Sequence, residues 1–428
     1  MSTLLSDLPE GPRLPRAVQT ALFMRARHRF APRWRAKYGP VFTMRLALGR
    51  TVVVVTRPED IRAVFAGPPE VFHAGEGNSI LAPVMGRDSV LILDEDAHLR
   101  SRKRLMPAFN GAALRGYADM MRELAAKAAD SLPTGTPLPI HAPMNAVTLE
   151  IILRVVFGMA DGERLTALRP RINKVVDVGP VQIFGWTYPQ LQRFPPWKTM
   201  RRHLAAADDL LNAEIAERRG QDLTGRDDVL SRLLAADPDT PASQLRDDMM
   251  TLLLAGHETT ATALAWSFHE LARDPDAQAR ARQAADSGDD EYLQAVAKEA
   301  MRLRPVIYSV ARRLTEPTEV AGRLLPAGTI VTPSIGLSHA DPDNFAGPAE
   351  FRPERFLGAS PEAGTWIPFG GGVRRCIGAG FALQESAAVL REVLTRHTIA
   401  PGGPREDARS RNITLVPERG ARVVLTPR

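Results

Sequence analysis

The sequence predicts a mainly α-helical fold with small β-sheets, on three observations. Residues 98–300 read chiefly as helices, because Ala, Leu and Arg recur at helical spacing between short Pro or Gly breaks. Within them, residues 243–273 form one long uninterrupted segment. Residues 305–375 are rich in Pro and Gly, which is typical of strands and loops. No repeat or flexible linker is visible, so we expect a single domain over residues 1–428, with a large helical part at about 98–300 and a smaller β-rich part formed by the N-terminal strands and about 305–375.

Two segments before the helical region are expected to be extended, and one segment within it is expected to be a loop. The opening, MSTLLSDLPEGPRLP, is punctuated by proline, which predicts extended chain. Residues 51–56, TVVVVT, are β-branched and lie between Gly49-Arg50 and Arg57-Pro58, which predicts a buried strand. Later, residues 179–197 combine aromatic side chains with prolines, so we expect a mobile apolar loop with short helices there.

Residues 243–273 predict one helix that runs through the interior. Ser243 is placed to cap its N-terminus, and Asp274 with Pro275 is placed to end it. At 1.5 Å per residue its length is about 45 Å. Residues 249–255 are apolar on nearly every face, so we expect this part of the helix to be buried.

The β-rich part follows the helical region and leads into the C-terminus. The segment LLPAGTIVTPSIG has the Pro and Gly punctuation of short strands and turns. A last helix is predicted to begin near Cys376 and to end near His397. Hairpin-like strands should then continue to Arg428.

Composition narrows the class of protein. Hydrophobic residues make up 44% and charged residues 24%, as in an ordinary globular protein. The net charge of +6 comes from 55 Lys+Arg against 49 Asp+Glu. Nearly all of the basic residues are arginine, which we interpret as a coding bias, so no nucleic-acid partner is expected.

The cysteine content and the N-terminal sequence indicate the cellular compartment of the protein. Cys376 is the one cysteine, so no intrachain disulfide can form, which fits a reducing cytosol. The N-terminus lacks the basic and apolar regions of a signal peptide. No uncharged apolar run reaches the length of about 18 residues that a membrane span needs. We therefore expect a soluble cytoplasmic protein without a membrane anchor.

The surroundings of Cys376 differ from those of an inert buried thiol. The segment reads Pro368-Phe-Gly-Gly-Gly-Val-Arg-Arg-Cys-Ile-Gly378. Three consecutive glycines allow a sharp turn, two arginines precede the sulfur, and a helix follows it. Positive charge and a helix N-terminus both lower the pKa of a thiol, so we expect an ionised sulfur. A single cysteine does not make a structural zinc site without unusual partners.

The same segment resembles the haem-binding signature of the cytochrome P-450 family. The match holds at every specified position of the pattern, which here reads Phe369-x-x-Gly372-x-Arg374-x-Cys376-x-Gly378. The resemblance implies the family's mainly helical fold and a haem cofactor (heme b, iron protoporphyrin IX) whose iron is bound by Cys376. It further implies that Phe369 packs beside the sulfur and that Arg374 pairs with a haem propionate. Gly370 and Gly378 are expected to contact the cofactor as well.

The middle of the long helix carries a second motif. Its sequence, Ala255-Gly-His-Glu-Thr-Thr260, resembles the family's oxygen-activation motif. A carboxylate at the centre of a buried apolar helix is costly unless it is paired, so Glu258 requires an explanation. The resemblance implies that Ala255 and Gly256 lie against the haem, with Gly256 leaving room for oxygen. It also implies that Glu258 and Thr259 form an acid–alcohol pair that delivers protons.

Two further arginine motifs stand in the family's order. Glu299 and Arg302 share a helix face at i and i+3, where a surface ion pair is the plain interpretation. With Arg355, in the segment Phe-Arg-Pro-Glu-Arg-Phe, the resemblance instead implies a buried Glu–Arg–Arg cluster with a structural role.

Other basic residues are candidates to bind the haem propionates. His98 and Arg102 stand at helical i, i+4 spacing, and a solvated basic face would explain them equally well. The resemblance assigns both to the propionates. It assigns Arg312 to the same role, although the adjacent Arg313 could fill it after a slip of one residue.

The resemblance implies a haem-thiolate monooxygenase that inserts one atom of O2 into a lipophilic small molecule, by hydroxylation or epoxidation. The walls of the substrate site are expected to be formed by residues 74–92 and 179–197 together with Ile307 and Val310. These walls are largely apolar, which favours a hydrophobic substrate. Electrons would come from an acidic ferredoxin and its NAD(P)H-dependent reductase. The ferredoxin is expected to dock on a basic face that comprises Arg100, Arg102, Lys103, Arg104 and Arg375.

Three alternatives remain open at this point. A peroxide-driven peroxygenase or an isomerase would use the same haem-thiolate centre, but the retained pair Glu258 and Thr259 argues against both. A haem-based gas sensor or carrier is the third, and no additional output domain is visible in the sequence to support it.

Overall fold

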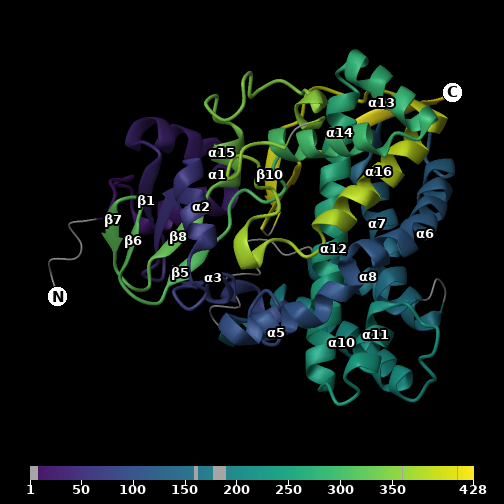
Figure 1. Cartoon of the computed structure of the whole chain (residues 1–428), viewed down its shortest axis with the longest axis horizontal. Helices are drawn as coiled ribbons and strands as arrows, with labels where there is room; N and C mark the ends of the chain where they lie inside the picture. Colours follow the sequence, from purple (N-terminus) through teal and green to yellow (C-terminus); the bar gives the residue numbers. More distant parts are fainter. Residues whose placement is uncertain (1–7, 159–161, 177–188, 359, 412) are drawn as a thin grey trace.

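The computed structural model describes residues 8–158, 162–176, 189–358, 360–411 and 413–428. Most of the long helices gather on one side of the molecule, and the largest sheet lies on the other side, near the N-terminus (Figure 1). The mainly helical fold with small sheets that the sequence predicts is confirmed.

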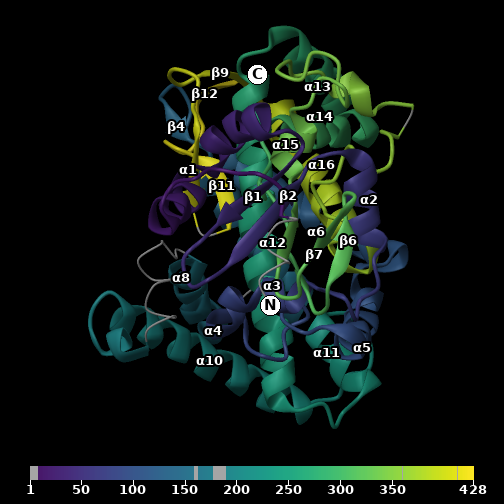
Figure 2. The same ribbon diagram turned by 90° about the vertical axis from the view of Figure 1, so that its left-hand side faces the viewer.

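The helical part is built around α12 (Ala242–Leu271), which crosses the molecule from one end to the other in Figure 2. Helices α7 (His141–Phe157), α14 (Asp290–Leu303) and α16 (Ala379–Arg396) pack along it, and their apolar side chains share one core. None of the described helices is both long and apolar enough to cross a bilayer. The other helices of this part are α5 (Glu95–Leu105), α6 (Gly111–Asp130), α8 (Glu163–Val176), α10 (Trp197–Arg219), α11 (Val229–Ala236) and α13 (Pro275–Ser287).

The bounds of α12 agree with the prediction within two residues, but its predicted cap is wrong. Pro241 occupies the N-cap position without a side-chain hydrogen bond, and Ser243 lies inside the first turn. Asp274 does follow the end of the helix, yet its carboxylate caps the next helix by accepting from the Ala277 N–H at 2.9 Å. An Asp-Pro pair starts a helix as readily as it ends one, because proline at the first helical position lacks only an N–H that needs no partner there.

The largest sheet has the strand order β1-β2-β8-β5-β3. Strands β1 (Val41–Arg45) and β2 (Thr51–Val55) form an antiparallel hairpin, and β8 (Ile330–Pro333) runs parallel to β2. Strands β5 (Arg312–Leu314) and β3 (Phe72–His73) complete it with antiparallel pairing. The predicted strand is therefore β2. Its valines belong alternately to two apolar clusters, one on each face of the sheet, which explains its continuous apolar sequence.

The predicted C-terminal strands are present. Strands β10 (Ala408–Arg411) and β11 (Thr414–Pro417) form an antiparallel hairpin, and β12 (Arg422–Pro427) pairs with β9 (His397–Pro401) and β4 (Leu138–Pro139). The short elements that remain are β6 (Thr318–Val320), β7 (Arg323–Leu325), α2 (Pro58–Ala66), α3 (Ala74–Gly77), α4 (Ala82–Met85), α15 (Ile335–His339) and the 3-10 helices η2 (Ser79–Leu81), η3 (Met106–Phe109), η5 (Pro353–Phe356) and η6 (Gly372–Arg374).

The opening, which was expected to be extended, contains no helix or strand over its described residues 8–15, and the 23-residue helix α1 (Arg16–Tyr38) begins directly after it. Pro15 stands at the N-cap, a position that tolerates proline because the first N–H groups of a helix have no partner inside it. Farther along, Trp34 is buried with Phe42 of β1 in one apolar cluster. The prolines therefore mark the start of a helix and not the absence of one.

The predicted apolar loop at residues 179–197 is described only in part. Residues 177–188 lie outside the described residues. The remainder contains the 3-10 helix η4 (Pro189–Arg193), and α10 starts at Trp197.

Candidate active site

The loop before Cys376 is shaped by glycine and by a neighbouring helix. Gly372 has φ +63°, and a Cβ built on it would lie 1.9 Å from the backbone oxygen of Phe65 at the end of α2. Only glycine fits such a position, on both counts. The Cys376 N–H donates to the Phe369 carbonyl at 2.9 Å, which closes the loop just before α16. The chain thus turns sharply and presents the sulfur from a fixed backbone.

Opposing effects act on the pKa of the Cys376 thiol. The Cys376 side chain is exposed, while protein surrounds it closely enough that burial raises the pKa of the thiol. A backbone hydrogen bond from Gly378 and the charges of Arg102 and Arg375 act in the opposite direction. These groups are present as expected, but they do not outweigh burial. A metal cation bound to the sulfur would favour its ionised form.

Four of the predicted cofactor-binding side chains lie close together beside this loop. Burial, followed by the charges of Arg374 and Arg102, lowers the pKa of His98 to about 4. Burial and the charge of Arg374 lower the pKa of Arg312 to about 10, and burial likewise lowers that of Arg374 to about 10. We call His98, Arg102, Arg312 and Arg374 the cation cluster.

The cation cluster carries more positive charge than the protein around it neutralises. Arg374 forms an ion pair with Asp94 and donates to the carbonyl oxygens of Val90 and Leu93. Asp94 raises the pKa of His98, Arg312 and Arg374, yet all three values stay lowered. Additional carboxylates would therefore stabilise the cluster. The two propionates of a haem are such groups, so the residues present fit this cofactor.

The structure separates the two adjacent arginines of β5. Arg312 is buried, lies over the ring of Phe65 and belongs to the cation cluster. Arg313 is half-exposed and forms an ion pair with Glu76 at 2.8 Å. Successive side chains of a strand point to opposite faces, so only one of the two can face the cluster.

The middle of α12 has one open face in an otherwise buried helix. Residues 249–254 and 260–271 are buried, whereas Ala255 is exposed and Thr259 is partly exposed. At i and i+4 these two residues lie on the same face, and the Thr259 hydroxyl donates to the Ala255 carbonyl at 2.7 Å. An open turn inside a buried helix is the surface that a bound cofactor or substrate can contact.

Gly256, which is partly exposed, also has a packing role that the sequence did not show. A Cβ at this position would lie 2.9 Å from Cγ1 of Ile152 on α7. Gly256 therefore permits the close packing of α12 on α7, and the space it leaves faces that helix. The sequence could not distinguish this from room for oxygen, because both require the absence of a side chain.

Glu258 does not share the open face. Its buried carboxylate accepts hydrogen bonds from Arg411 of β10 at 3.1 and 3.2 Å and from Asn145 of α7 at 3.3 Å. Neighbouring residues of a helix point about 100° apart, so this carboxylate and the Thr259 hydroxyl lie on different faces. Sequence reasoning missed Asn145 and Arg411, which are remote in the chain and belong to no motif.

The predicted Glu–Arg–Arg cluster is present. Glu299 and Arg302 are fully buried, with nitrogen–oxygen distances of 2.7 and 2.9 Å, and Arg355 Nε lies 3.3 Å from Glu299 Oε1. The other N–H groups of Arg302 donate hydrogen bonds to the carbonyl oxygens of His339, Pro348 and Glu350. These bonds join α14 to the irregular chain before the Cys376 loop.

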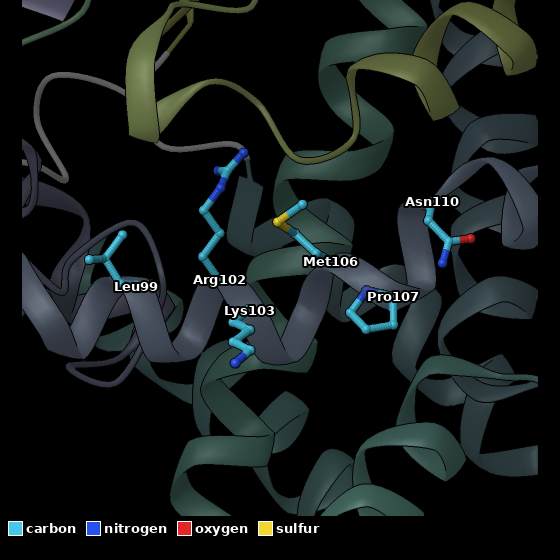
Figure 3. Close-up of a pocket in the computed structure, with 6 residues that line it drawn as sticks. All are labelled: Leu99, Arg102, Lys103, Met106, Pro107 and Asn110. Carbon is cyan, nitrogen blue, oxygen red and sulfur yellow. The ribbon is translucent and has the colours of Figure 1, made fainter. Parts of the chain in front are cut away.

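The basic face on α5 is smaller than predicted. Arg104 is turned inward, where it forms a 2.6 Å ion pair with the fully buried Asp248 of α12. In Figure 3, Arg102 and Lys103 point in opposite directions, with Arg102 toward the yellow-green C-terminal part of the chain. A shallow surface pocket of about 400 Å³ lies here, and it is lined by Leu99, Arg102, Lys103, Met106, Pro107 and Asn110 (Figure 3).

Comparison with known proteins agrees with these features. The family model described as Cytochrome P450 matches residues 9–425. Cytochrome P450 135A1 of Mycobacterium tuberculosis is 48% identical over 100% of this chain and 97% of its own length. Cytochrome P450 135B1 of Mycobacterium bovis is 45% identical over 97% of this chain and 91% of its own length.

A solved structure extends the likeness to the fold. The retinoic-acid-bound cyanobacterial CYP120A1 superposes with a TM-score of 0.85 at 25% identity and covers 98% of this chain and 100% of that one. The glycine-shaped cysteine loop, the surplus of buried cations beside it and the open turn of α12 thus occur together with the family's sequence and fold. The chain belongs to the cytochrome P450 family, the haem-thiolate monooxygenases.

Proposed function

We propose that this monooxygenase oxidises a lipophilic small molecule with O2 and with electrons delivered by an acidic ferredoxin and its NAD(P)H-dependent reductase. The observation that carries the proposal is that the chain has both an exposed Cys376 in a glycine-shaped loop and an open turn at Ala255 and Thr259 in an otherwise buried helix. Haem bound at such a site supplies the activation of O2, with the thiolate donating electron density to the iron. The protein supplies the sulfur, holds the cofactor, excludes water and delivers protons.

The cofactor proposed is haem b, which would be held by the Cys376 loop and by the cation cluster. Cys376 binds the iron, and Phe369, Gly370 and Gly378 surround the sulfur. Phe369 is partly buried and packs edge-on against Trp366 at 5.8 Å, which would fix its ring beside the ligand. The propionates would meet the cation cluster, with Arg312 and not Arg313 as the arginine from β5.

Thr259 and Glu258 are proposed to deliver protons from two positions on α12. The Thr259 hydroxyl lies on the open turn, and the Glu258 carboxylate lies behind it. Thr259→Ala should leave the fold and haem content intact, since alanine is at least as good a helix former. NAD(P)H consumption should continue while product per NAD(P)H falls and hydrogen peroxide rises. An unchanged ratio of product to NAD(P)H, without additional peroxide, would remove Thr259 from the mechanism.

The substrate is proposed to be hydrophobic. Ile307 and Val310, which we expect to line the site, pack as partly buried members of an apolar cluster. Ile80 and Leu91 of the 74–92 segment pack against the main core in the same way. The related CYP120A1 binds retinoic acid, a molecule with a long apolar body, which agrees with this class. A panel of fatty acids, terpenoids, steroids and polyketides should therefore contain ligands that shift the Soret band from low spin to high spin.

Isotope labelling separates the monooxygenase from its alternatives. With a ligand found in that panel, 18O2, a ferredoxin, its reductase and NADPH, the product should contain one labelled oxygen atom. An isomerase would give no label. A peroxygenase would give label from 18O-labelled hydrogen peroxide and would need no reductase.

The ferredoxin is proposed to dock on the face formed by α5 and the Cys376 loop. Leu99, Met106 and Val373 are exposed there, and exposed Arg100, Lys103 and Arg375 supply positive charge. Apolar contact at the centre and charge at the rim would hold and steer an acidic partner. Electron transfer should slow as salt rises, because screening acts over about 8–10 Å. Rates independent of ionic strength would contradict charge steering.

We also propose that the chain forms a single domain that works in the cytoplasm. The core cluster that includes α7, α12, α14 and α16 supports the first statement. The single cysteine, which fits a reducing compartment, supports the second. One cooperative unfolding transition and recovery in the soluble cell fraction are the expected results.

A further inference from the structure

Arg27 on α1 is a buried cation that the described chain does not neutralise. Its side chain belongs to a residue that is 8% exposed. In the part of the chain that the structure describes, Nη2 donates to the Ile413 carbonyl oxygen at 2.7 Å, and Arg27 forms no ion pair. Burial lowers the pKa of Arg27 to about 10, and Tyr308 opposes this effect. Burial also raises the pKa of Tyr308, so its phenol is neutral at pH 7 and does not balance the charge.

The other buried arginines among the described residues show how unusual this is. Except for Arg312, each of them bonds to a carboxylate of the chain. The partners are Glu214 and Asp228 for Arg218, Asp208 and Asp247 for Arg246, and Glu299 for Arg302. Arg312 belongs to the cation cluster, for which we propose the haem propionates. A buried charge without such a partner is costly, so Arg27 also requires an anion.

The propionates and the neighbouring carboxylate of the chain do not serve Arg27. Helix α1 lies beside β10 and away from α5, which carries two members of the cation cluster (Figures 1 and 2). Asp407 does contact α1, but its Oδ2 lies 2.6 Å from Arg29 Nη2 and its Oδ1 lies 3.8 Å from His28 Nε2. The anion that would neutralise Arg27 therefore comes from outside the described chain.

Arg27 lies beside a segment that we expect to line the substrate site. Ile413, whose carbonyl oxygen accepts from Arg27, directly precedes β11. The next residue, Thr414, pairs with Ile307 in an isolated β-bridge. Ile413 is 39% exposed, although its side chain is apolar. A ligand held here would meet one positive charge next to apolar chain segments, which suits a molecule with one charged end and an apolar body.

We propose that Arg27 binds the carboxylate of the substrate, so that the substrate is a lipophilic carboxylic acid. The inference rests on the proposed function and narrows its substrate class. A guanidinium recognises a carboxylate through two parallel hydrogen bonds, and these are strong where little water competes. Arg27 takes no part in the oxidation itself. It holds the acid by its charged end and leaves the apolar body free to extend toward the haem.

The test compares acids with their uncharged derivatives on the haem-loaded protein. Decanoic, lauric and abietic acid, each with its methyl ester, are measured as radiolabelled ligands by equilibrium dialysis. Each acid that binds should bind about 10- to 100-fold more tightly than its ester. Arg27→Met should remove this preference and leave the affinity for the ester unchanged or higher, whereas a structural defect would weaken both. Arg25→Gln is the matched control, because Arg25 is an exposed arginine on the same helix.

Arg27→Met is expected to fold, since it replaces an unneutralised buried charge by an apolar side chain of similar length. Arg27→Lys keeps the charge but not the paired donors, so its preference for the acids should lie between those of the wild type and Arg27→Met. If Arg27→Met does not fold, wild-type affinity for the acids in Arg27→Lys would overturn the proposal.

Three further results would overturn it: no preference for any acid in the wild type, a preference that survives in Arg27→Met, or an equal loss in Arg25→Gln. Failure of the proposed function gives a different result. In that case no lipophile, acid or neutral, yields a product labelled from 18O2, while the dialysis measurement still reports on Arg27. Labelled products from neutral lipophiles without any preference for acids would overturn the role of Arg27 alone.

Discussion

Two buried groups of charges in this fold differ in how completely the chain itself neutralises them. Around Glu299, the carboxylate meets Arg302, Arg355 and the Arg352 N–H, and the remaining donors of Arg302 reach three backbone carbonyls. In the cation cluster, Asp94 interacts with His98, Arg312 and Arg374, and burial lowers the pKa of all four members. The first group is complete within the chain. We propose that anions from outside the chain complete the second, and such a difference would distinguish a structural cluster from a binding site.

The largest effect is expected where the complete cluster is broken. Glu299→Gln leaves two buried guanidinium groups without their carboxylate, which costs about 3–5 kcal/mol. A natural domain has only about 5–15 kcal/mol of stability, so most of the protein should unfold or aggregate on expression. Denaturant unfolding of any soluble fraction measures the loss. A variant with wild-type stability would show that the cluster is not structural.

Removal of the sulfur should spare the fold and change the spectrum. Cys376→Ala deletes the proposed ligand, and no other cysteine exists to replace it. The ferrous CO complex should therefore lose the red-shifted Soret band of the family, while the Glu299 cluster keeps the protein folded. Circular dichroism is the control for folding. Persistence of the red-shifted band in this variant would remove the central assignment.

The cation cluster should be dispensable for folding and necessary for the cofactor. Arg312→Leu removes a buried charge that the chain does not neutralise, so resistance to denaturant should be unchanged or higher. Loss of a charge-assisted hydrogen bond to a propionate should speed transfer of haem to apomyoglobin about 10- to 100-fold. Arg313→Leu is the matched control, because its side chain is half-exposed and pairs with Glu76. Equal effects of the two substitutions would contradict the assignment of Arg312.

The smallest expected effect is a change in how folding stability depends on pH in acid. His339 accepts from the Ile367 N–H at 2.9 Å and lies beside Arg302, and burial with that charge lowers its pKa to about 3. Its unfolded-state value is 6.5, so as pH falls below 6.5 the unfolded state binds a proton that the folded state does not. Stability should fall by about 1.4 kcal/mol per pH unit from this residue. His339→Gln should flatten the dependence between pH 6 and about 4 by roughly one proton. An unchanged slope would show that His339 does not contribute.

Features that depend on neighbouring residues could be predicted from the sequence. The Cys376 loop, the pair Glu299 and Arg302, and the bounds of α12 follow from short spacings and helical periodicity. The choice between Arg312 and Arg313 could not be made, because a slip of one residue reverses the two faces of a strand.

Features that depend on remote parts of the chain were not accessible. Arg411 reaches Glu258 across 153 residues, and Gly256 is set by Ile152 on another helix. The charges of neighbouring arginines, which lower the pKa of the Cys376 thiol, are visible in the sequence, whereas its burial, which raises that pKa, depends on the whole fold. Helix α1 was missed because prolines at a helix start look like prolines in a coil.

The contact between Gly372 and Phe65 has a consequence for directed evolution of this enzyme. A Cβ at position 372 would lie 1.9 Å from the Phe65 carbonyl oxygen, whereas a Cβ at Gly378 would meet open space among the described residues. Random libraries should therefore lose nearly every clone that changes codon 372, and compensation would require a shift of α2 and not a second substitution nearby.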